Sequence, residues 1–103
     1  MEIKIKATKL ELSPELKDYV REKMDMLDRY LGNFPVINAD VELERTTNHH
    51  SKGEIYRAEI NLSVPGELLR VEDTGTEIYE AIDKAKDLME KMIIKYKEKR
   101  KGL

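Results

Sequence analysis

Apolar and polar residues alternate strictly in three segments of the chain, and this is the pattern of a β-strand with one buried face. The first segment covers residues 2–8, and the other two cover residues 37–44 and 56–64. The positions expected to face the core are Ile3, Ile5 and Ala7, then Ile37, Ala39, Val41 and Leu43, then Tyr56, Ala58, Ile60, Leu62 and Val64. We expect the second and third segments to be antiparallel neighbours.

Two other segments carry apolar residues at helical spacing. In the first, Ser13 is a natural N-cap, Pro14 suits the first helical position and Gly32 is a natural stop. In the second, Thr74 and Glu77 have the spacing of a capping box. They predict a helix from about residue 75 to 98, roughly 35 Å long, whose basic last turns project beyond the core.

The remaining segments complete a β-α-β-β-β-α order. Pro65-Gly66 predicts a turn, residues 68–72 predict a short fourth strand, and the polar residues 46–53 predict a loop. Both helices need the apolar face of the sheet. We therefore expect an α+β fold, a two-layer sandwich with a four-stranded antiparallel sheet and two helices on one face.

Composition limits the chain to one solvated domain. Of the 103 residues, 40% are hydrophobic and 39% are charged, against roughly 25% charged in an average domain. The absence of cysteine excludes disulfides, thiol catalysis and cysteine-ligated zinc. No segment has the apolar length of a membrane span and no signal peptide is present. A cytoplasmic location without membrane contact is the expectation.

Catalytic motifs are missing from the sequence. His49 and His50 are adjacent in the predicted loop, and surface histidines are a better interpretation of them than a metal site. The glycines are isolated, so no phosphate-binding loop is present. Nearly all of the carboxylates fall on solvent faces, so the sequence identifies no acid-base pair for catalysis. We expect a protein that is not an enzyme and has no cofactor, metal or small-molecule substrate.

Charge is distributed unevenly. The net charge is −2, but residues 1–83 carry 11 basic and 18 acidic residues, whereas residues 84–103 carry 8 basic and 3 acidic residues. On a helical wheel Lys84, Lys91 and Lys95 form a stripe about 40° wide. Such a stripe favours contact with a phosphate backbone. The alternative is a solvated helix end that complements the helix dipole.

The other cations of the two helices are less regular. The last helix also carries Lys86, Lys97 and Lys101 on its opposite flank, with Lys99 and Arg100 at its tip. Lys23 occupies an apolar position in the first helix, so it must extend past a sheet edge or toward the other helix. There it either joins the Lys84 stripe in one surface or pairs with a carboxylate. The outer cations of the first helix are Lys17, Arg21 and Arg29.

Three apolar residues of the predicted helices fall outside the centre of the apolar faces, two at an edge and Ile94 off the face altogether. They are Met26, Leu88 and Ile94. A single exposed apolar residue is normal in a folded domain. Together the three predict, as an alternative, a patch for protein interaction or dimerisation.

Several short motifs, in order, resemble the ribosome hibernation promoting factor family, whose members are also called ribosome-associated translation inhibitors or ribosomal subunit interface proteins. They include Leu12-Ser13-Pro14-Glu15-Leu16 and Leu27-Asp28-Arg29-Tyr30-Leu31. Further motifs are Leu69-Arg70-Val71-Glu72-Asp73, Glu77-Ile78-Tyr79-Glu80-Ala81-Ile82-Asp83 and Lys95-Tyr96-Lys97. The resemblance covers nearly the whole chain, and its order and spacing make it specific.

The resemblance implies a β-α-β-β-β-α domain, similar in layout to double-stranded RNA-binding domains, that binds the small ribosomal subunit between head and body. There it faces ribosomal RNA and ribosomal proteins and occludes the messenger and tRNA sites during starvation or stationary phase. The implied rRNA-binding residues are Lys23, Arg29, Lys84, Lys91, Lys95, Lys97 and Lys99. The second group of candidates is Lys17, Arg21, Lys86, Arg100 and Lys101.

The resemblance also bears on domain organisation. Residues 1–98 are expected to form the ribosome-binding domain, and residues 99–103 a basic tail or the start of a linker. Family members occur in a short form and in a long form with a C-terminal dimerisation domain, so paired, 100S-type ribosomes and idle single ribosomes are both open outcomes. A general double-stranded RNA-binding module is the alternative function.

Overall fold

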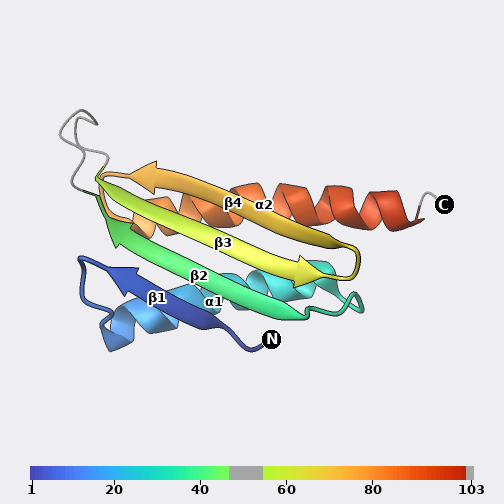
Figure 1. Ribbon diagram of the computed structural model, residues 1–103, viewed down its shortest axis with the longest axis horizontal. Coiled ribbons are helices and arrows are strands. Elements are labelled where there is room, and N and C mark those ends of the chain that lie inside the picture. The colour runs from blue at the N-terminus through green and yellow to red at the C-terminus, as the bar shows by residue number, and fades with distance from the viewer. Residues whose placement is uncertain (47–54, 102–103) are drawn as a thin grey trace.

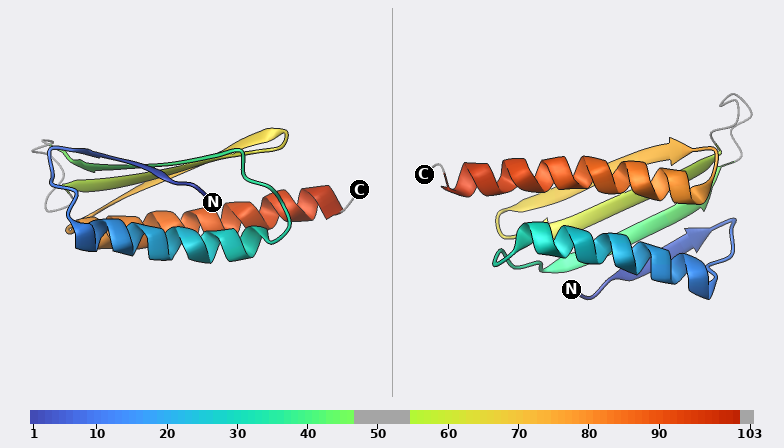
Figure 2. Two further views of the ribbon diagram at one scale, coloured as in Figure 1. Left: turned by 90° about the horizontal axis from the view of Figure 1, so that it is seen from below. Right: turned by 180° about the vertical axis from the view of Figure 1, so that it is seen from behind.

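The computed structural model describes residues 1–46 and 55–101 as a sheet covered by two helices. Its elements are β1 (Lys4–Thr8), α1 (Pro14–Leu31), β2 (Asn38–Arg45), β3 (Tyr56–Val64), β4 (Glu67–Gly75) and α2 (Ile78–Lys101). Both helices lie on one face of the sheet (Figures 1 and 2). The predicted α+β two-layer fold is confirmed. Of the loop predicted over 46–53, all but Thr46 lies outside the described residues, as do His49 and His50.

The sheet has the order β1-β2-β3-β4 and is mixed, not purely antiparallel. As predicted, β2 and β3 are antiparallel neighbours, with Val41 opposite Ile60. However, β1 pairs with β2 in parallel, with Ile5 opposite Val41. The prediction of an antiparallel sheet was therefore wrong for β1. The reason is that α1 carries the chain back along the sheet, so that β2 starts at the same end as β1.

The core lies between the sheet and the helix pair. Helix α1 buries Leu16, Val20, Met24, Leu27 and Leu31, which recur every three or four residues along one face. The predicted inward positions of the three strands are buried or half-buried, with one exception. Ile37 is 71% exposed. It lies before the first residue of β2, in the connection from α1, where strand alternation does not apply.

The ends of α1 agree with the sequence prediction. The Ser13 hydroxyl accepts a 3.1 Å hydrogen bond from the Leu16 N–H. Pro14 is the first helical residue, where its missing N–H leaves no hydrogen bond unmade. The Gly32 N–H donates to the Asp28 carbonyl at 3.1 Å, with Gly32 at a φ of +61°. A glycine adopts this left-handed conformation without steric cost.

The start of α2 differs from the prediction. Pairing with β3 extends β4 as far as Gly75, opposite Tyr56, so Thr74 belongs to the strand. The helix begins at Ile78, and the Glu80 carboxylate in its first turn accepts the Thr76 N–H at 2.9 Å. The capping box of Thr74 and Glu77 was therefore wrong. At its other end α2 continues to Lys101 and extends past the turn between β3 and β4 (Figure 1).

Candidate nucleic-acid interface

The two long flanks of α2 have different surroundings. One flank lies against α1, and the other follows the outer strand β4 (Figure 2). Helical spacing puts Lys84, Lys91 and Lys95 on the flank beside β4, and Lys86 and Lys97 on the flank beside α1. We call the first set the β4 flank. We call the region between α1 and α2, which includes Lys86 and Lys97, the seam.

The β4 flank presents its lysines to solvent. Lys91 and Lys95 are exposed and line a shallow groove of about 360 Å³ between α2 and β4. The other residues of this groove are Val71, Glu72, Leu88 and Met92. Lys84 Nζ lies 4.0 Å from Asp73 Oδ1 at the end of β4. The stripe predicted from the sequence thus lies on one surface of the folded protein.

Lys23 does not belong to that surface. Its Nζ lies 3.6 Å from Asp83 Oδ1 on α2 and 5.1 Å from the centre of the Tyr19 ring, between the two helices. Lys84 contacts β4 on the other flank of α2, so the body of the helix separates the two lysines. The hypothesis that Lys23 joins Lys84, Lys91 and Lys95 in one surface is not supported. Its alternative, pairing with a carboxylate, agrees with the structure.

The other seam lysines also have partners within the protein. Lys86 is nearly buried, and its Nζ lies 2.8 Å from the Glu90 carboxylate. This hydrogen bond raises the pKa of Lys86 and lowers the pKa of Glu90. Lys97 Nζ donates a 2.7 Å hydrogen bond to the Tyr30 carbonyl and lies 5.9 Å from the Phe34 ring centre. Lys86 therefore offers little charge to an external phosphate.

The tip of α2 is attached to the turn between β3 and β4. The Arg100 guanidinium donates a 2.5 Å hydrogen bond to the Pro65 carbonyl and lies over the Tyr96 ring, whose hydroxyl donates to the same carbonyl at 3.1 Å. Lys99 Nζ lies 3.4 Å from Glu67. The basic end therefore extends beyond the sheet as predicted, but Lys99 and Arg100 contact the protein itself, and Lys101 is exposed.

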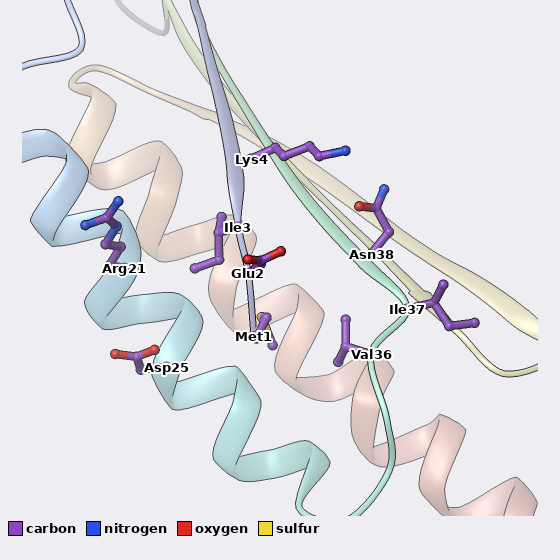
Figure 3. A pocket seen from close by; sticks show the side chains of 9 residues that line it. All are labelled: Met1, Glu2, Ile3, Lys4, Arg21, Asp25, Val36, Ile37 and Asn38. Carbon is purple, nitrogen blue, oxygen red and sulfur yellow. The ribbon is translucent and has the colours of Figure 1, made fainter.

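The outer cations of α1 lie apart from the β4 flank. Lys17, Arg21 and Arg29 are all exposed. Arg21 lines a cavity of about 620 Å³ between α1, the N-terminal segment and the start of β2, on the side of α1 away from α2 (Figures 2 and 3). Asp25 lines the same cavity. This placement separates Arg21 from the lysines of α2.

The three residues of the candidate apolar patch, Met26, Leu88 and Ile94, do not lie on one surface. Leu88 and Ile94 are both partly exposed, but Leu88 lines the groove beside β4. Six residues of helix rotate Ile94 by about 120° from Leu88, onto the outward side of α2. Met26 is half-buried on α1. Leu88 therefore does not share a continuous surface with the other two residues.

The acidic residues of the seam, Asp83 and Glu90, were not predicted from the sequence. Asp83 accepts a 2.5 Å hydrogen bond from the Tyr19 hydroxyl, which, with burial, raises the pKa of Tyr19 to about 12. Tyr79 packs edge-on against Tyr19, with ring centres 4.8 Å apart. The available signal was spacing, because Asp83 and Glu90 are seven residues apart and share one flank of the helix.

Residues 1–46 and 55–101 contain neither a cluster of metal-ligating side chains nor a helix suited to a membrane. No group of three or more His, Asp or Glu side chains in these ranges is placed to hold a metal ion. No helix in them has the length and apolar character needed to cross a membrane.

The fold and its lysine flank define an α+β domain with a positively charged helix surface. Residues 3–101 match the family described as "Sigma 54 modulation protein / S30EA ribosomal protein". The chain therefore belongs to this family, and the resemblance inferred from its motifs is confirmed.

Several curated relatives carry the name "Ribosome hibernation promotion factor". The protein of Deinococcus radiodurans is 32% identical over 88 residues, which are 85% of this chain and 44% of that protein. The protein of Bacillus subtilis is 30% identical over 99 residues, 96% of this chain and 50% of that protein. The chain thus spans about half the length of the curated relatives it matches.

Solved structures support the same fold. The N-terminal domain of Thermus thermophilus Protein Y has a TM-score of 0.77 and 33% identity, and the match covers 93% of this chain and 99% of that one. A ribosomal subunit interface protein from Coxiella burnetii has a TM-score of 0.72 at 20% identity, over 94% and 98% of the two chains. The second likeness concerns the fold alone.

Proposed function

We propose that this chain is a ribosome hibernation factor that inhibits translation without catalysis. It binds the small ribosomal subunit between head and body, contacts ribosomal RNA, and occludes the messenger and tRNA sites in the cytoplasm of starved or stationary cells. The names of its relatives support a ribosomal partner. The observation that carries the proposal is the exposed lysine flank beside β4.

The geometry of this flank suits a phosphate backbone. Lys84, Lys91 and Lys95 extend over roughly 16 Å of one helix at ~1.5 Å per residue. Because α2 is packed on the sheet, these ammonium groups are held on one side of a rigid element. Each phosphate that they neutralise releases counterions, so the affinity depends steeply on salt.

The other proposed contacts differ in how readily they meet RNA. Arg29 and Lys101 are exposed and act directly. Lys23, Lys97 and Lys99 have partners within the protein, so each contacts a phosphate only by exchanging that partner. Lys91 and Lys95, which are exposed, therefore form the primary contact, and the lysines with partners, Lys84 beside Asp73 among them, strengthen it once the domain has docked.

The test is sedimentation of small subunits with the triple variant Lys84→Glu, Lys91→Glu and Lys95→Glu. We expect the variant to fold normally but to remain in the supernatant at ~0.1–0.2 M salt. The matched control places the same charge change on the outer face of the sheet, as Lys4→Glu, Lys6→Glu and Arg70→Glu, and should still co-sediment. Unchanged co-sedimentation of the first variant would refute this assignment of the site.

A comparison with naked RNA separates this function from a general double-stranded RNA-binding module. A hibernation factor should bind small subunits much more tightly than a free RNA duplex at the same salt concentration. Equal affinity would favour the general module, because such modules recognise duplex shape. Sedimentation of whole ribosomes in the same series also shows whether paired ribosomes form.

A further inference from the structure

The carboxylate of Asp83 on α2 pairs with the ammonium group of Lys23 on α1. Their closest atoms, Nζ and Oδ1, are 3.6 Å apart. The Asp83 side chain is 47% exposed, whereas the Lys23 side chain is only 22% exposed. A polyanion that approaches this pair therefore finds the acidic side chain more accessible than the basic one.

Two contacts keep the carboxylate in this position. The Tyr19 hydroxyl donates its hydrogen bond to the same oxygen, Oδ1, that faces Lys23. The Tyr19 ring is itself held, because Tyr79 packs edge-on against it and Lys23 lies over it. Asp83 thus belongs to an ordered cluster in which the carboxylate has little freedom to turn away.

The β4 flank has the opposite arrangement. In the pair formed by Lys84 and Asp73, the lysine side chain is the more exposed member, at 40% against 33%. Lys91 and Lys95 are exposed as well. On one flank of α2 the lysine is therefore the more exposed member of its ion pair, and on the other flank the carboxylate side chain is the more exposed member.

We infer that Asp83 is a specificity-determining residue, which by pairing with Lys23 weakens the contact of that lysine with ribosome-free RNA. This inference rests on the proposed function. Uniform phosphates on a free duplex are repelled by Asp83, since like charges that face each other across an interface oppose binding. A structured ribosomal site is able to place a hydrogen-bond donor against Asp83 and a phosphate against Lys23 together. Specificity then arises as a difference between two affinities.

The variant Asp83→Asn tests this role. The amide keeps an oxygen that accepts the Tyr19 hydroxyl, but it removes the negative charge. Binding to a free RNA duplex should strengthen by up to about fivefold at ~0.1 M salt, the upper end of the range for one exposed charge pair. The salt dependence should steepen by about one phosphate contact. Binding to small subunits should change less, so the preference for the ribosome should fall.

Three further variants keep the test specific. Asp87→Asn removes an exposed carboxylate from the same helix, where its contact is with Lys86, and should give a smaller gain. Lys23→Gln combined with Asp83→Asn should return duplex affinity to that of Lys23→Gln alone, because the gain acts through Lys23. Tyr19→Phe keeps the charge but removes the hydrogen bond that holds the carboxylate, and should give a smaller gain than Asp83→Asn. Thermal unfolding establishes that each variant is folded.

The outcomes distinguish this inference from the proposed function. If wild-type protein fails to co-sediment with small subunits, the proposed function is wrong. If wild-type protein co-sediments but Asp83→Asn binds duplex no more tightly than Asp87→Asn, only the role of Asp83 is refuted. A gain that persists without Lys23 also refutes it, since a general change in charge would then explain the effect.

Discussion

The ammonium group of Lys97 on α2 donates a 2.7 Å hydrogen bond to the carbonyl oxygen of Tyr30, the penultimate residue of α1. Carbonyl groups in the last turn of a helix have no partner within the helix, and a cation there also complements the helix dipole. Lys97 therefore caps α1 from the neighbouring helix. This bond joins residues 67 positions apart and fixes the ends of the helices relative to each other.

Replacing Lys97 should act mainly on the stability of the fold and less on ribosome binding. We expect Lys97→Met to reduce the free energy of unfolding by about 1 kcal/mol, because the Tyr30 carbonyl loses a charged donor. The matched control is Lys95→Met, on the exposed flank, which should cost less than about 0.5 kcal/mol. Urea denaturation measures both. Equal losses would contradict the capping role of Lys97.

Arg57 links the strands across the outer face of the sheet. Its guanidinium contacts four carboxylates, those of Glu42, Glu44, Glu59 and Glu72. Arg57→Met should cost about 2 kcal/mol, between the values for exposed and buried ion pairs, because it leaves like charges on adjacent strands. Arg70→Met removes a more exposed arginine and is the control, with a smaller loss expected. Chemical denaturation at neutral pH distinguishes the two.

Glu59 makes the stability of the protein depend on pH in the acidic range. A hydrogen bond from Asn61 and the contact with Arg57 hold the pKa of Glu59 below its ordinary value of 4.5. A carboxyl group with a lowered folded-state pKa stabilises the protein above the unfolded-state pKa, and the contribution is lost as the pH falls through the folded-state value. Stability measured from about pH 5 to pH 3 should therefore fall less in Glu59→Gln than in wild-type protein. Parallel curves would contradict this.

Tyr19 should make the stability of the protein fall as the pH rises in the alkaline range. Its hydrogen bond to Asp83, together with burial, raises its pKa from 10.0 to about 12. A phenol with a raised pKa contributes stability below the unfolded-state value, and this contribution is lost as the pH rises through the folded-state value. Wild-type protein should lose more stability than Tyr19→Phe between about pH 10 and pH 12. Ultraviolet titration of Asp83→Ala should show the tyrosine ionising nearer to 10.

The turn at Gly66 and the tip of α2 should be energetically coupled. Gly66 has a φ of +83°, and a Cβ atom there would lie 2.5 Å from Arg100 Nη2. Gly66→Ala should cost about 1–2 kcal/mol through backbone strain and displacement of Arg100 from the Pro65 carbonyl. In an Arg100→Met background the same change should cost less. A double-mutant cycle by denaturation measures this coupling, and strictly additive losses would argue against it.

Local signals predicted the secondary structure well wherever a residue's own neighbours decide it. Ser13 and Pro14 start α1 and Gly32 ends it, because capping depends on groups a few residues apart. The beginning of α2 was harder. Thr74 and Glu77 satisfy a capping motif, but pairing with β3 keeps Thr74 in the strand. Pairing between β3 and β4 therefore decided the conformation of Thr74, and its local preference for a helix N-cap did not.

The candidate interface was predicted in part. Lys84, Lys91 and Lys95 share a flank because helical periodicity alone places them there. Lys86 pairs with Glu90 four residues further along the same helix, a spacing that the sequence already contained, whereas the partner of Lys23 is Asp83, which lies on the other helix. No spacing within either helix separately reports the distance between side chains on two different helices.

The sequence by itself determined the order of the elements, the residues of the core and the lysine stripe of α2, because these follow from periodicities of two and 3.6 residues. Only the tertiary structure decided that β1 runs parallel to β2, that Lys97 caps α1, and that Asp83 pairs with Lys23. These relationships join residues far apart in the chain, so they depend on how the helices cross the sheet and not on local preference.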